Sequence, residues 1–331
     1  MSSAFASPLQ ASKPVGARSS TIHGCSRSGF TLVELLVVIA IITVLAGMTV
    51  GGALVARVYV KNAAINMELK QLEMACQAYK EKFGEYPPDG TNAAAVARHL
   101  RKAFPRCSES AYPKWVCEVD RSDPNNPVYT TALNPATALG FWLGGVSDGN
   151  GRLIGFSADP TNPFSPSAAS RIGPFFDFDP LRQKGGVVSD TDTTPYQYWP
   201  QGAEGEKTTG PIVYFRAENG HYDNAKQAVT ANNIDPSAKY KVFCPYPAVD
   251  TRLSNVPTTY VWVNPKSFQI FSSGLDVQYA MLKGGTVYSN CLAFPTGENY
   301  YMEVATDPHP GASSFDDITN FSGGKLESAI P

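Results

Sequence analysis

A long apolar run with one acidic residue near its start is the feature that most constrains this sequence. Residues 29–48 read GFTLVELLVVIAIITVLAGM, with Glu34 as their one charged residue. A carboxylate held in hydrocarbon costs about 3 kcal/mol or more unless a partner charge offsets that cost. Cleavage after Gly29 would create an α-amino group on Phe30 at the depth of Glu34. We therefore expect Glu34 to pair with the Phe30 amine of a neighbouring copy.

The residues from Gly29 to Glu34, followed by an apolar helix, resemble the class III signal of type IV prepilins and type II secretion pseudopilins. The resemblance implies three steps: a membrane prepilin peptidase cuts between Gly29 and Phe30, Phe30 is N-methylated, and an inner-membrane platform assembles the subunit into a filament. The partners in that filament would be further copies and related pilins. An ordinary secretory signal cleaved near residues 51–53 is disfavoured, because Glu34 interrupts its apolar part. A plain membrane anchor leaves Glu34 unexplained.

The uncharged run 35–56 is long enough to cross about 30 Å of hydrocarbon. The chain before Glu34 contains only basic charges, namely Lys13, Arg18 and Arg27. The positive-inside rule therefore predicts that the N-terminus stays in the cytoplasm and that the rest of the chain crosses the membrane once. The resemblance to prepilins implies that this membrane is the bacterial inner membrane and that the C-terminal domain is periplasmic. Residues 1–29 form the expected leader, disordered and then removed.

The helical pattern continues beyond the membrane segment. Apolar residues recur at spacings of three and four: Ile65, Leu69, Leu72, Cys76, Tyr79 and Phe83. Gly84 and the prolines at 87 and 88 predict the helix end. We expect an α+β, pilin-like fold: a long N-terminal helix, half of it transmembrane, packed on an antiparallel β-sheet domain with large loop insertions. The expected parts are the leader 1–29, the helix 30–88 and a loop-rich β domain 89–331.

Shorter elements follow in the pattern of apolar residues and prolines. Helices are expected at 92–104 and 136–143. Strands are expected at 212–216, 258–263, 268–272 and 300–304. The strands 258–263 and 268–272 are expected to pair as an antiparallel hairpin.

Composition argues against nucleic-acid binding and against catalysis. Without the leader the net charge is about −5, and no basic cluster interleaved with aromatic residues is present. The sequence at 145–149 fits G-x-S-x-G, but its glycine-rich surroundings predict a turn rather than a strand and a helix. The histidines at 99, 221 and 309 lie in no catalytic or metal-binding motif. We expect a structural protein that is not an enzyme.

Five of the six cysteines follow the leader, and an oxidising compartment permits disulfides. Cys107 and Cys117 flank a short segment and are the expected pair. Cys76 falls on the apolar face of the predicted helix, where a buried thiol is the simpler expectation.

The C-terminal part is acidic, and residues 272–276 with 316–321 resemble the calcium-binding end of major secretion pseudopilins. The resemblance implies that Asp276 and Asp317 bind calcium, with Asp316 as a further candidate. Two departures count against it: Val277 replaces a glycine of the family, and about forty residues separate the two acids. The alternative is that Asp316 caps a turn and Asp276 is solvated.

The expected function is a structural subunit of a type II secretion-like pseudopilus or of a type IV pilus-like filament. The mature chain is about twice as long as the family's major pseudopilins need, so a minor or adhesive pilin is the alternative. A membrane-anchored surface module that binds glycans through tryptophans is the rival from another class. Core packing would explain the same tryptophans, which are Trp115, Trp142, Trp199 and Trp262.

Overall fold

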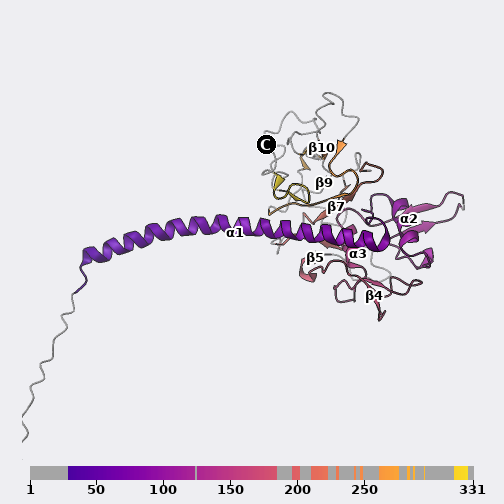
Figure 1. Ribbon diagram of the computed structural model, residues 1–331, viewed down its shortest axis with the longest axis horizontal. Helices are drawn as coiled ribbons and strands as arrows, with labels where there is room; N and C mark the ends of the chain where they lie inside the picture. Colours follow the sequence, from indigo (N-terminus) through magenta and orange to yellow (C-terminus); the bar gives the residue numbers. More distant parts are fainter. Residues whose placement is uncertain are drawn as a thin grey trace, which may run out of the picture. The chain divides into compact units, whose positions relative to one another are not determined.

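The computed structural model describes residues 29–123, 125–184, 196–201, 210–222, 229–230, 242–243, 247–248, 261–275, 282–283, 286–287, 294 and 317–326. The chain forms two compact units, Met1–Leu54 and Val55–Pro331. Helix α1, Leu32–Phe83, contributes its first part to the first unit and its second part to the second (Figure 1). The long helix and the small antiparallel sheets confirm the mixed α+β, pilin-like fold class.

The second part of α1 packs against the rest of its unit through the predicted apolar stripe. Five of its six residues, from Ile65 to Tyr79, are fully buried, and Phe83 is nearly so. The helix ends at Gly84, which has a φ of +81° and donates its N–H to the Lys80 carbonyl at 2.7 Å. A positive φ suits glycine, so the predicted helix end is confirmed.

Two further α-helices lie close to the predicted positions. Helix α2, Ala93–Ala103, begins after Asn92, whose side chain accepts a hydrogen bond from the Ala95 N–H. Helix α3, Ala138–Gly144, is buried along its whole length. Two short 3₁₀ helices lie in loops. The first, η1 at Glu109–Ala111, follows α2, and the second, η2 at Pro180–Arg182, comes later in the chain, after α3.

The strands are short and pair antiparallel. Their bounds are β1 Glu118–Asp120, β2 Val128–Thr130, β3 Phe156–Ser157, β4 Arg171–Ile172, β5 Gln183–Lys184, β6 Gln197–Tyr198, β7 Val213–Arg216, β8 Val229–Thr230, β9 Val242–Phe243, β10 Pro247–Ala248, β11 Val261–Trp262, β12 Phe268–Ser272, β13 Leu282–Lys283, β14 Thr286–Val287 and β15 Ile318–Thr319. Strands β7, β12 and β15 form a three-stranded sheet in the order β15-β12-β7, and the other strands pair two by two.

The predicted hairpin of 258–263 with 268–272 is wrong. Strand β12 is buried at every residue and pairs with β7 on one side and β15 on the other. A central strand has no free edge, so β11 pairs instead with β10. A turn at Asn264, with a φ of +53°, separates β11 from β12. The strand expected at 300–304 lies outside the described residues.

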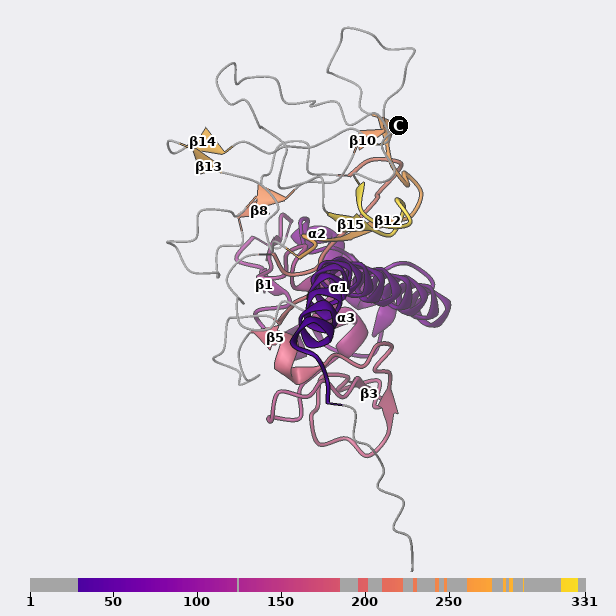
Figure 2. The same ribbon diagram turned by 90° about the vertical axis from the view of Figure 1, so that its left-hand side faces the viewer.

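Within the second unit, the three-stranded sheet lies on one side of α1, and strands β3 to β6 lie on the other (Figure 2). Aromatic side chains fill much of the core near the end of α1, where a chain of ring contacts links Phe83, Phe104, Phe156, Phe141 and Phe164. The four tryptophans are all buried, which supports their role in core packing.

Candidate functional site

The first turn of α1 is closed by a reciprocal pair of side chains, Thr31 and Glu34. The backbone N–H and the hydroxyl of Thr31 both donate to Glu34 Oε2, each at 2.8 Å. The Glu34 N–H donates back to the Thr31 hydroxyl at 3.2 Å. The Thr31 carbonyl accepts the first helical bond, from Leu35 at 3.2 Å. This arrangement is a capping box, which satisfies backbone donors that a helix start leaves unpaired.

Thr31 is a residue whose role the sequence analysis missed. The signal for it is present, because Thr-Leu-Val-Glu directly before an apolar run is the pattern of a capping box. The box holds the Glu34 carboxylate within a few residues of the bond between Gly29 and Phe30. It also occupies Oε2 with two local donors, so the carboxylate is oriented before any other chain approaches.

The large apolar side chains around this turn and in the helix after it are exposed to solvent in the first unit. Phe30, Leu32 and Val33 are about 70% or more exposed, and the large apolar residues from Leu35 to Met48 are also exposed. The segment Leu32–Thr49 is long and apolar enough to cross a membrane. An exposed apolar surface of this extent is typical of segments that lie in lipid or pack against other proteins.

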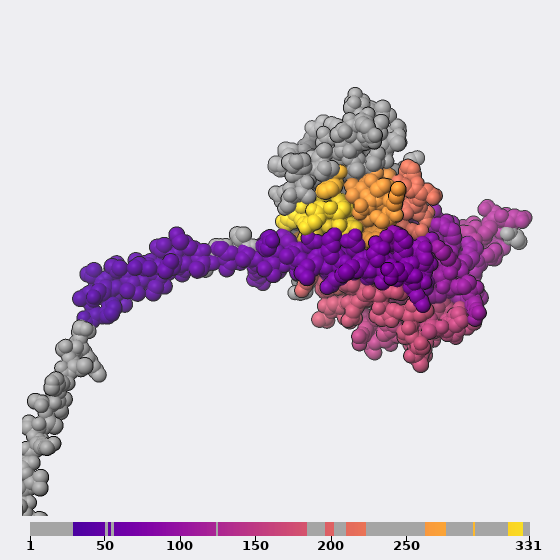
Figure 3. All heavy atoms as spheres, viewed as in Figure 1, coloured from indigo at the N-terminus to yellow at the C-terminus, as the bar shows by residue number. Residues whose placement is uncertain are grey.

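A second apolar surface lies on the part of α1 within the second unit. Val60, Met67 and Met74 are spaced by seven residues and are 64%, 67% and 63% exposed. Seven residues are close to two helical turns, so the three side chains lie on one face of the helix. We call these three residues the outer stripe. Figure 3 shows one side of α1 uncovered in this unit, between the segments that flank it.

Comparison with known proteins identifies the start of the chain. Residues 25–50 match the family model of the prokaryotic N-terminal methylation motif. The chain carries a prepilin-type methylation signal. This signal indicates a precursor of the type IV pilin and pseudopilin class, whose members are structural. It contains Gly29, Phe30, Thr31 and Glu34, and the apolar helix behind it suggests membrane anchoring. No curated protein and no solved structure matched the chain.

In the second unit, a buried ion pair connects the second part of α1 to the loop that contains η2. Glu68 is 6% exposed. Its Oε1 lies 2.6 Å from Arg182 Nη2, and its Oε2 accepts a hydrogen bond from Arg182 Nη1 at 2.9 Å. The Tyr198 hydroxyl donates to the same carboxylate at 2.9 Å, and the Arg182 guanidinium lies 4.7 Å from the centre of the Tyr198 ring. The Gln201 N–H adds a fourth donor at 3.3 Å. Glu68 is therefore satisfied by its surroundings, as a buried charge requires.

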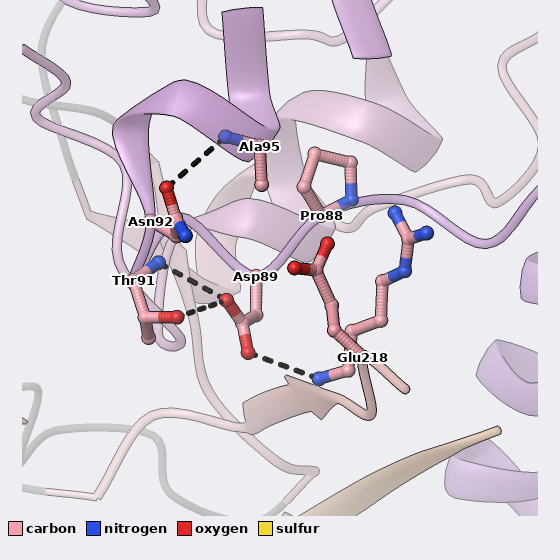
Figure 4. A pocket seen from close by; sticks show the side chains of 7 residues that line it. Pro88, Asp89, Thr91, Asn92, Ala95 and Glu218 are labelled. Atoms are coloured by element: carbon pink, nitrogen blue, oxygen red, sulfur yellow. Dashed lines mark hydrogen bonds between the residues drawn. The ribbon is translucent and has the colours of Figure 1, made fainter. Parts of the chain in front are cut away.

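A small surface hollow lies at the start of α2, lined in part by Asp89, Arg216 and Glu218 (Figure 4). Asp89 Oδ1 accepts from the Thr91 N–H and hydroxyl at 3.0 and 2.6 Å, and Oδ2 accepts from the Arg216 N–H at 3.0 Å. Burial raises the pKa of Asp89, against these hydrogen bonds. The carboxylate fixes the chain before α2 to strand β7, which is a structural role.

The structure describes one of the three calcium candidates. Asp317 is buried, and the pairing of Ile318 with Ser272 places Asp317 beside Ser273 at the end of β12. Asp276 and Asp316 lie outside the described residues. Among the residues that are described, no group of three or more His, Cys, Asp or Glu could hold a metal ion. The calcium site therefore stays a prediction, with one of its residues placed next to the expected turn.

Cys76, Cys107 and Cys117 are free thiols in the structure, and all three are buried. Burial raises the pKa of Cys107, and it raises that of Cys117 to about 11. Cys76 packs in the core as expected. The pairing of Cys107 with Cys117 stays a prediction, which a count of free thiols in the purified protein would test.

Proposed function

We propose that this chain is the precursor of a filament subunit, in a type II secretion-like pseudopilus or a type IV pilus-like fibre. Prepilin peptidase would cut between Gly29 and Phe30, and N-methylation of Phe30 would follow. The observation that carries the proposal is the capping box, because it presents an oriented carboxylate, Glu34, next to the amine that cleavage creates.

The chemistry of assembly follows from this geometry. Both donors of Thr31 point at Glu34 Oε2, and an ammonium group of a neighbouring copy would bind the carboxylate through Oε1. An unpaired ammonium or carboxylate in hydrocarbon is costly, so pairing between copies favours the assembled state. The outer stripe supports the same proposal, since a helix packed against other helices in a fibre would cover Val60, Met67 and Met74.

The proposed location is the inner membrane, with the N-terminus in the cytoplasm and the domain after α1 in the periplasm. The basic leader supports this orientation. Prepilin peptidase, the assembly platform, further copies and related pilins are the proposed partners. A reporter enzyme that is active only in the periplasm, fused after residue 331, should be active, whereas the same reporter fused before residue 1 should be inactive.

Mass spectrometry of the mature N-terminus tests the proposal most directly. The expected terminus is Phe30 with an added methyl group. Gly29→Leu should leave the full-length precursor in the membrane, while Gly29→Ala should be processed more normally. A mature terminus near Arg57 would instead identify an ordinary secretory signal and overturn the proposal.

A calcium-stabilised periplasmic end is the second candidate. The supporting observation is that β12 and β15 bring the buried Asp317 beside Ser273, next to the segment in which the resemblance predicts the other ligands. Backbone carbonyls near Ser273 and the carboxylates of Asp276, Asp316 and Asp317 could supply the six to eight oxygens that calcium prefers.

A further inference from the structure

Two buried side chains and one half-buried carboxylate, from three successive segments, form a continuous hydrogen-bonded row at the end of α1. The Tyr79 hydroxyl of α1 lies 2.8 Å from His99 Nε2 of α2. His99 Nδ1 lies 2.6 Å from Oε1 of Glu85, which follows the helix end. The side chains of Tyr79 and His99 are completely buried. The row therefore joins the end of α1, the turn after it and α2.

The positions of the hydrogens in this row follow from the chemistry of the groups. An ionised Glu85 can only accept, so His99 Nδ1 carries a hydrogen and donates it. In a neutral imidazole the other nitrogen, Nε2, has no hydrogen and accepts from the Tyr79 hydroxyl. Neutral His99 thus satisfies both neighbours at once.

The groups around His99 come from α2, β7, α3 and the turn after α1, and most of them are charged. Glu85 also binds Lys102 Nζ of α2 and Arg216 Nη2 of β7, each at 3.3 Å. Trp142 of α3 contributes only its ring, 5.0 Å from the imidazole. Burial lowers the pKa of His99, and Arg216 and Lys102 act in the same direction, against the effect of Glu85.

We propose that Tyr79, His99 and Glu85 form an acid-sensitive latch, closed at neutral pH and opened when His99 takes up a proton. The added proton goes to Nε2, which then donates to the Tyr79 hydroxyl oxygen instead of accepting from it, so this hydrogen bond reverses its direction. The hydroxyl hydrogen must turn toward the surrounding rings, and the new cation lies buried near Arg216 and Lys102. Opening would loosen the contact of α2 with the end of α1. This device is independent of the proposed filament function.

The direction of the pH dependence follows from the lowered pKa. A histidine with a lowered folded-state pKa binds fewer protons in the folded than in the unfolded state. The contribution of His99 to the free energy of unfolding is fully present above about pH 6.5, which is the pKa of histidine in an unfolded chain. It is lost as the pH falls through the lower pKa that His99 has in the folded protein. Glu85 remains ionised in this window, because the hydrogen bond from His99, together with the nearby charges, lowers its pKa to about 2.

Thermal melts of the full chain in detergent test the latch between about pH 7.5 and pH 5. The melting temperature of the wild type should fall on acidification, and His99→Gln should fall clearly less. His221→Gln is the matched control, since His221 is exposed and lies outside the row. It should behave as the wild type does. The proposal would be overturned if acidification lowered the melting temperature of His99→Gln as much as that of the wild type.

Amide hydrogen exchange of the wild type decides the case even where a variant fails to fold. After correction for intrinsic rates, protection of α2 should decrease between pH 7.5 and 5, about in parallel with the melting temperature, while strands β5 and β6 keep theirs. Equal loss of protection everywhere, or no loss in α2, would overturn the latch. Neither result would bear on cleavage at Gly29.

Discussion

Single residues in this chain carry charge in places where charge is costly, and each is held by specific partners. Glu34 is oriented by Thr31 in the apolar segment, Glu68 is enclosed by Arg182 and Tyr198, and Glu85 binds His99 and two cations. The prepilin signal singled out Glu34 but not its contact with Thr31. The other two depend on contacts between residues more than ten positions apart, which sequence periodicity does not contain.

Thr31→Val should weaken assembly without preventing cleavage. The variant keeps the backbone N–H but removes the hydroxyl that donates to Glu34 and accepts from its N–H. Loss of such a cap costs about 1 kcal/mol, equivalent to about a fivefold change in an equilibrium. The amount of subunit recovered in filaments by shearing, divided by the total amount of subunit in the cell, measures the effect. Thr31→Ser restores the hydroxyl and should assemble as the wild type does; equal assembly of Thr31→Val would show that the cap is dispensable.

Arg182→Ala should destabilise the second unit by about 3–5 kcal/mol, because it leaves the buried Glu68 carboxylate without its cation. Denaturant melts of the full chain in detergent measure the loss. Glu68→Ala in the same chain should recover part of it, since the unpaired charge is then gone. Lys70 and Glu73 offer a control pair at the surface, with side chains 50% and 33% exposed, for which either alanine variant should cost at most about 1 kcal/mol. Similar losses for the two pairs would contradict the role of the buried one.

At the scale of elements, period-3.6 patterns predicted the helices well, and strand pairing was poorly predicted. The stripe from Ile65 to Phe83 is buried, and α2 lies within the predicted range 92–104. Strand β12 was found, but its partners were not, because β7 and β15 lie about fifty residues away on either side. The choice between neighbouring and distant partners depends on burial of the whole strand, which a local pattern does not specify.

The outer stripe is the exposed counterpart of that buried face of α1. Met67→Glu places a charge in its centre and should abolish filament recovery, because the charge would have to be buried between helices. The melting curve of the isolated chain should change little, since Met67 is exposed. Met67→Leu keeps the apolar surface and is the control. Normal filaments from Met67→Glu would mean that this face stays in contact with solvent.

At the scale of the whole molecule, the prepilin signal and the fold class were predictable, because both depend on local composition and period. The three-stranded sheet could not be predicted, because residues near 215, 270 and 318 meet only in the folded chain. The same sheet places Asp317 beside Ser273, so it decides whether the predicted calcium ligands can converge.

Calcium should raise the melting temperature of the full chain in detergent, relative to the same sample with a chelator. A ligand that binds only the folded state stabilises it by about 2.7 kcal/mol at a hundredfold excess over its Kd. Asp317→Asn should remove the increase, because the neutral amide weakens the site while its size is kept. Asp177→Asn, at an exposed carboxylate far from the sheet in sequence, should leave the increase intact. Equal melting temperatures of the wild type with calcium and with chelator would exclude the site, and the filament proposal would stand unchanged, since it depends on the first turn of α1.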